Sequence, residues 1–111
     1  MNPMFRSSFS ESIFQHKYAH EGCETWADLC RTLVTDVMGT RSTKDQQDQL
    51  VQYMTDLKFI PGGRYLYYAG RPKKFFNNCF LLRAEEDTRE DWANLSWKSE
   101  LCLSSGGGIG V

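Results

Sequence analysis

The sequence predicts an α/β protein in which a helical N-terminal region precedes a strand, a helix and the start of a second strand. Apolar residues recur at steps of three and four through residues 21–57, as in amphipathic helices. Aromatic residues, glycines and prolines then dominate residues 59–83, a composition typical of loops and short extended segments. A further helical stretch lies between two extended ones. At 111 residues the chain holds one domain at most.

The first region, residues 1–60, is expected to be helical. A first helix is predicted near Glu11–His20, and a second over residues 21–39, closed by Gly39 just past its end. A third helix begins at Thr43, with Gln46 placed as in a capping box. The predicted apolar faces of the second and third helices comprise Trp26, Leu29, Cys30, Leu33, Val34, Val37 and Met38, and Leu50, Val51, Met54 and Leu57.

The second region, residues 61–111, contains the strand–helix–strand order. Residues 75–83 read as a strand buried on both faces, as in the core of a parallel sheet or barrel. The helix that follows begins at Asp87 or Thr88, whose side chains cap helix N-termini well. Only Ile109–Val111 remains for a second strand, so the parallel crossover is incomplete and the first strand lacks a neighbour from this chain. We therefore expect a partner chain, and poor stability of this chain alone.

Composition and charge exclude several classes of protein. The net charge is −1 and 41% of residues are hydrophobic, values typical of globular proteins without affinity for nucleic acid or anionic membranes. The aromatic residues, with no basic groove between them, indicate core and interface rather than base stacking. No secretory signal or membrane-spanning run is present, which predicts a cytoplasmic protein with free thiols.

The motifs with chemical potential are the glycine cluster, two histidines and one cysteine. The cluster at residues 106–108 fits neither a dinucleotide fingerprint nor a P-loop, and leaves two alternatives, a helix C-cap or a loop that approaches a ligand closely. His16 and His20 have a spacing that can share a metal, but no further ligands accompany them, so no metal site is predicted. Cys79 begins the predicted strand, whereas the cysteines predicted to pack on apolar helix faces are Cys23, Cys30 and Cys102.

Three blocks in order resemble the start of the catalytic domain of ribonucleotide reductases. They are "PGGRYLYYAG", "NNCFLLRAEEDTREDW" and "GGGIGV", and the wording is most similar to the class II, adenosylcobalamin-dependent enzymes, including those of phages. The segment "KYAHEGCETWADLC" also resembles the helical N-terminal region of that class. The resemblance covers nearly the whole chain.

The resemblance implies a fold, a chemistry and a set of residues. It implies the first elements of a ten-stranded α/β barrel, and a reaction in which a thiyl radical takes the ribose 3′-hydrogen while a cysteine pair supplies electrons and becomes a disulfide. Cys79 matches one of that pair, Asn78 the small polar residue before it, and Gly107 and Gly108 the turn that lines the substrate site. The radical cysteine, the second reducing cysteine and the adenosylcobalamin site have no counterpart here. They are expected on a complementary chain, with a ribonucleoside di- or triphosphate as substrate and a thiol reductant such as thioredoxin or glutaredoxin.

Other functions remain open at this point. A class I reductase fragment, whose radical comes from a separate metal-containing subunit, would carry similar blocks. A non-catalytic helical module that binds or regulates a reductase would need no reactive cysteine. A self-sufficient thiol enzyme would need a base near Cys79, and none is evident in the sequence.

Overall fold

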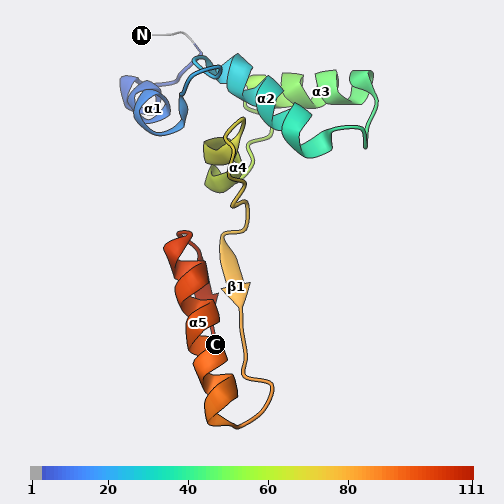
Figure 1. The fold of residues 1–111 in the computed structure, drawn as a ribbon. Coiled ribbons are helices and arrows are strands. Elements are labelled where there is room, and N and C mark those ends of the chain that lie inside the picture. The colour runs from blue at the N-terminus through green and yellow to red at the C-terminus, as the bar shows by residue number, and fades with distance from the viewer. Residues whose placement is uncertain (1–3) are drawn as a thin grey trace. The chain divides into compact units, whose positions relative to one another are not determined.

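The computed structural model describes residues 4–111, and the chain divides into two compact units between Lys74 and Phe75. Most of the first unit is helical (Figure 1). Its elements in chain order are helix α1 (Ser8–Ile13), the π-helix η1 (Phe14–Tyr18), and helices α2 (Trp26–Met38), α3 (Lys44–Thr55) and α4 (Gly63–Tyr68).

The hydrophobic core of the first unit lies between α2 and α3, which pack side by side (Figure 1). The predicted apolar faces of both helices are confirmed, because each contributes its buried residues from those positions. The indole N–H of Trp26 donates to the carbonyl oxygen of Met54 at 3.1 Å, which satisfies the one polar atom of that buried side chain. The buried residues of this core are Phe14, Cys23, Trp26, Leu29, Cys30, Leu33, Val34, Val51, Met54, Leu66 and Ala69.

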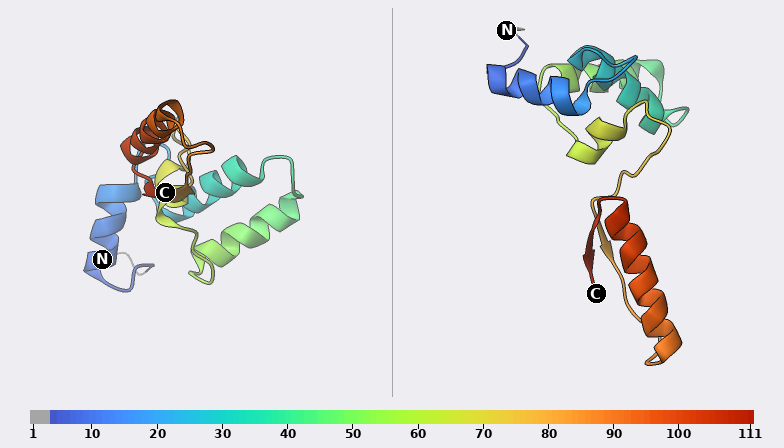
Figure 2. Two further views of the ribbon diagram at one scale, coloured as in Figure 1. Left: turned by 90° about the horizontal axis from the view of Figure 1, so that it is seen from below. Right: turned by 60° about the vertical axis from the view of Figure 1, so that its left-hand side comes forward.

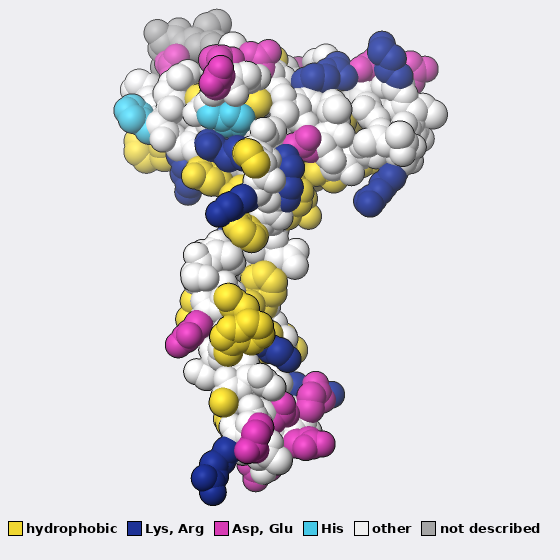
Figure 3. Space-filling model, in the orientation of Figure 1, with side chains coloured by type: hydrophobic (Ala, Val, Ile, Leu, Met, Phe, Trp, Pro, Cys, Tyr) yellow, Lys and Arg dark blue, Asp and Glu magenta, His cyan; other side chains and the backbone are white. Residues whose placement is uncertain are grey.

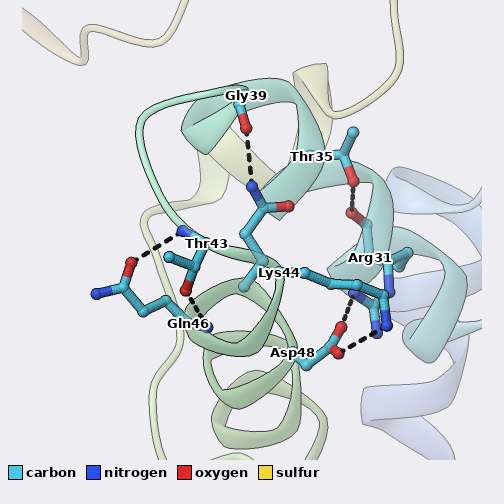
Figure 4. Close-up of polar contacts among 8 residues, drawn as sticks. Arg31, Thr35, Gly39, Thr43, Lys44, Gln46 and Asp48 are labelled. Carbon is cyan, nitrogen blue, oxygen red and sulfur yellow. Dashed lines mark hydrogen bonds and ion pairs between the residues drawn. The ribbon is translucent and has the colours of Figure 1, made fainter.

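The predicted capping box at the start of α3 is present (Figure 4). The Thr43 hydroxyl accepts from the Gln46 N–H at 3.2 Å, and the Gln46 side chain accepts from the Thr43 N–H at 2.9 Å. Asp48 one turn later accepts from both Arg31 of α2 and Lys44. These bonds fix the point at which the chain enters α3.

Helix α4 departs from the sequence prediction, which expected loop and extended structure over residues 61–74. Gly62 caps the N-terminal end of this six-residue helix, and Leu66 and the following Ala69 are buried against the core. The aromatic residues of the segment favour strands by propensity. Packing against α2 overrides that preference and turns the segment into a short helix.

The turn after α4 is held by a polar network to α2. The Gly70 N–H donates to Asp36 at 2.8 Å, and Lys74 forms an ion pair with the same carboxylate oxygen at 2.5 Å. The His20 Nε2 atom lies 2.8 Å from the carbonyl oxygen of Ala69. Burial alone would raise the pKa of Asp36, but the hydrogen bonds from Lys74 and Gly70 outweigh it and hold that pKa below its ordinary value.

The second unit consists of a two-stranded parallel sheet and one helix. The strands β1 (Cys79–Leu81) and β2 (Gly108–Gly110) are joined by α5 (Arg89–Ser104), which lies alongside them (Figure 2). The predicted start of the helix is confirmed at Thr88, whose hydroxyl accepts from the N–H of Asp91 at 3.1 Å. The Asp91 carboxylate in turn accepts from the N–H groups of Glu85 and Glu86 and orders the loop before the helix.

Several expectations for this unit are wrong. The fold is not the beginning of a barrel, because residues 4–111 form mainly helices and a single sheet of two three-residue strands, which cannot close on itself. The first strand does have a neighbour from this chain, since β2 pairs with it in full register. The strand is also shorter than residues 75–83, and it is not buried on both faces, because Cys79 is exposed and Leu81 is 89% exposed.

Candidate functional site

The parallel pairing of β1 and β2 brings the predicted site residues together. Cys79 lies opposite Gly108 in the register, and the Gly108 N–H donates to the carbonyl oxygen of Asn78 at 2.8 Å. A Cβ atom added to Gly108 would lie 3.5 Å from the Cys79 sulfur. Asn78 and Cys79 therefore lie next to Gly108, although α5 separates them from it in the sequence.

The three glycines of the cluster have three different roles. Gly106 has a φ of +84° and ends α5, with its N–H donating to Leu103 and the next N–H donating to Cys102. The helix-end alternative is thus confirmed for Gly106, which directly follows the C-cap residue Ser105, and the alternative of a loop that approaches a ligand closely stays a prediction. Gly107 is needed for space, because an added Cβ would lie 2.7 Å from the Phe80 ring. Gly108 leaves the surface beside the thiol bare.

The two faces of the strand pair differ in chemistry. Successive side chains of a strand point to opposite faces, so Phe80 lies against Gly107 while Cys79 and Leu81 share the other face. On that face β2 contributes only Gly108 and Gly110, which lie opposite them. On this face the Cys79 thiol therefore lies beside a strand without side chains, and the backbone of β2 is open to close approach.

The four cysteines are all free and divide by burial. Cys23 and Cys30 are buried, as predicted for packing residues, and burial raises the pKa of Cys30 to about 11. Cys102 is half-buried on α5, and only Cys79 is exposed. Since the thiolate is the reactive form and needs access, Cys79 is the thiol that is placed for chemistry in solution.

The site is an open surface. The second unit has a hollow of about 640 Å³ at the other end of the strands, lined by Leu81, Leu82, Arg83, Glu85, Lys98 and Val111. Ligands of parallel sheets generally bind beyond the carboxyl ends of the strands, where this hollow lies. Cys79 begins β1 and does not line the hollow, so enclosure of its thiol requires atoms from outside this unit.

The two histidines bond to backbone oxygen atoms. The His16 Nδ1 atom lies 2.8 Å from the Ser12 carbonyl oxygen, and the His20 ring lies between those of Ala69 and Glu21. Across residues 4–111 there is no group of three or more His, Cys, Asp or Glu residues arranged to hold a metal ion. In the same part of the chain, no helix combines the length and apolar character that crossing a membrane requires.

Sequence reasoning missed Phe80 as part of the site. Its ring fills the space under Gly107 and so explains why that position has no side chain. The contact joins β1 to the turn after α5, and no local pattern in the sequence reports a contact between such distant segments.

Comparisons with protein families, with curated protein sequences and with solved structures find no match to this chain.

Proposed function

We propose that this chain is the N-terminal part of a class II ribonucleotide reductase, which converts ribonucleotides to deoxyribonucleotides by thiyl-radical chemistry together with a second chain. The observation that carries the proposal is the register of β1 and β2. Two blocks of the resemblance, residues 77–92 and 106–111, meet so that Cys79 lies opposite Gly108 and Asn78 bonds to it. A reducing thiol beside bare backbone is the arrangement that contact with a sugar requires.

In this proposal Cys79 is a reducing thiol. It and a cysteine of the second chain each lose a proton and an electron and join in a disulfide. One proton leaves with the ribose 2′-hydroxyl as water, and the other proton and the two electrons form the new C–H bond at the 2′-carbon. The exposed sulfur of Cys79 is accessible both to a substrate and to a partner cysteine. A thiol reductant such as thioredoxin or glutaredoxin then restores the two thiols by thiol–disulfide exchange.

Within residues 4–111, the apolar hollow of the first unit does not fit adenosylcobalamin. A hollow of about 500 Å³ in the first unit is lined by apolar groups such as Leu33, Val37, Leu50 and Phe59. Its lining is almost wholly apolar, whereas the amide groups around a corrin ring need polar partners, and burial of such groups without partners is costly. We therefore assign the cofactor, together with the radical cysteine, to the second chain.

The test begins with tagged chain expressed in the native source, followed by mass spectrometry of the proteins that copurify. We expect a larger chain with the remaining catalytic residues, and nucleotide reduction by the complex that depends on adenosylcobalamin. Cys79→Ser should abolish turnover with a regenerated thiol reductant, whereas Cys102→Ser, a control in the same unit, should retain it. Full turnover by Cys79→Ser would refute the role of Cys79, and turnover without adenosylcobalamin would indicate a class I reductase.

A non-catalytic interaction module is a second candidate, favoured by the surface of α5. Trp92, Trp97, Leu101 and Leu103 are each more than half exposed, an unusual density of large apolar side chains for one helix. A partner that covers this helix would bind with equal affinity to the unaltered chain and to Cys79→Ser, and the complex would show no nucleotide reduction.

A further inference from the structure

The chain carries a strongly basic stretch that its nearly neutral net charge conceals. Residues 57–84 contain six Lys or Arg residues and no Asp or Glu. Four of these cations, Arg64, Arg71, Lys73 and Lys74, follow Gly63 in α4 and the segment after it. Figure 3 shows dark blue side chains gathered over α4. Aromatic residues, among them Tyr67 and Tyr68, accompany these cations.

Arg71 is held in one orientation by two contacts. Its Nε–H donates to the Tyr67 carbonyl oxygen at 2.6 Å, and its guanidinium carbon lies 4.3 Å from the centre of the Tyr67 ring. The Tyr67 ring is itself fixed edge-on against Tyr68, with 4.9 Å between ring centres. Both the position and the plane of the guanidinium are therefore set before any ligand arrives.

The outer edge of this guanidinium has no acidic partner. Within residues 4–111 neither terminal nitrogen of Arg71 is paired with a carboxylate. The nearest acidic group in the turn, Asp36, is already engaged by Lys74 and the Gly70 N–H. Lys73, two residues after Arg71, is exposed and adds a second positive charge.

We propose that Arg71 and Lys73 form a binding site for a phosphate group. The free edge of a guanidinium is a planar pair of donors that matches two phosphate oxygens, and the exposed Lys73 ammonium supplies a point charge to a third. Two adjacent cations suit a doubly charged group better than a single carboxylate. The phosphate belongs either to a free nucleotide or to a nucleic-acid strand.

The test measures binding to the full chain by calorimetry at low ionic strength. The probes are inorganic phosphate, ATP, a short oligothymidylate and a polyglutamate peptide. Arg71→Gln should weaken phosphate and ATP binding by about tenfold or more, because it removes charge-assisted hydrogen bonds. Arg71→Lys keeps the charge but loses the planar pair of donors, and should weaken binding by about threefold. Arg41→Gln, an equal change of charge on the same unit, should alter affinity by less than about twofold.

The outcomes separate the alternatives. Binding of phosphate and ATP that depends on Arg71 supports a nucleotide site, and much tighter binding of oligothymidylate, also dependent on Arg71, supports a strand as the source of the phosphate. Equal losses in Arg71→Gln and Arg41→Gln, or binding of polyglutamate alone, would overturn the proposal. Thermal unfolding of each variant checks that the fold is retained. Since these measurements need neither partner nor turnover, they are independent of the reductase proposal.

Discussion

Gly70 shows how one residue without a side chain allows the turn after α4 to lie against α2. Its φ is +71°, and an added Cβ would lie 2.8 Å from the Thr32 methyl group and 3.5 Å from the His20 ring. Gly70→Ala should lower the free energy of unfolding by about 2–4 kcal/mol, from the left-handed backbone and from the clash. Chemical denaturation of the full chain measures this loss.

Gly22 provides the matched control for that experiment. Its φ is +87°, but nothing lies within 4 Å of an added Cβ. Gly22→Ala should therefore lower the free energy of unfolding by only about 1 kcal/mol, the cost of the left-handed backbone conformation. Equal losses in the two variants would show that the Thr32 contact has no effect on stability.

Asp36 makes the stability of the first unit depend on pH. Its pKa is lowered in the folded state, so its contribution is present above the unfolded value of about 3.9 and is lost as pH falls through the folded value. At pH values below about 5 the denaturant concentration at the unfolding midpoint should decrease as the pH falls, and Asp36→Asn should make that decrease less steep. Asp48, whose pKa is lowered by Arg31 and Lys44 at the surface, serves as control, and Asp48→Asn should leave the slope nearly unchanged because solvent screens the pair.

At the scale of elements, the pairing of β1 with β2 places Gly108 beside the Cys79 thiol. Gly108→Ala adds a methyl group 3.5 Å from the sulfur without the close contact that Gly107→Ala would make with Phe80. We expect Cys79 to react first with iodoacetamide and to react several-fold more slowly in Gly108→Ala. Peptide mass spectrometry over time gives the rates, and Cys23 and Cys30 should react only on unfolding. An unchanged Cys79 rate would mean that β2 does not shield it.

The elements that could be predicted from the sequence are those specified by local patterns. The spacing of apolar residues predicts helices α2 and α3, and the capping side chains of Thr43 and Thr88 predict where α3 and α5 begin. Helix α4 could not be predicted, because Leu66 becomes helical through contact with a distant helix. The apolar run after Cys79 predicted burial, yet Leu81 is exposed. Hydrophobicity indicates that a side chain favours burial, but it does not show whether this chain contains the residues that would bury it.

The candidate site could likewise be predicted only in part from the sequence. The proximity of Cys79 to the glycine cluster was implied by the resemblance, and the register of the strands agrees with it. The separate roles of Gly106 and Gly107 depend on the backbone angle of one and on the Phe80 ring beside the other. Neither the angle nor the contact is encoded in the spacing of the glycines.

At the scale of the whole molecule, the buried apolar residues are divided unequally. Of the core residues within 4–111, Leu95 is the only one in the second unit, and all others belong to the first. A fragment of residues 1–74 should therefore unfold cooperatively on heating, whereas residues 75–111 should show little helix by circular dichroism. Cooperative unfolding of residues 75–111 alone would contradict this expectation and would remove one reason for a partner chain.

The parallel register of β1 and β2 has a consequence for synthesis of the chain. Parallel strands pair only after the connection between them is made, so β1 leaves the ribosome before α5 and β2 have emerged and paired with it. Throughout that interval Cys79 has no glycine turn beside it, and its thiol meets cellular oxidants directly. The surroundings of this cysteine are thus the last part of the second unit to be completed.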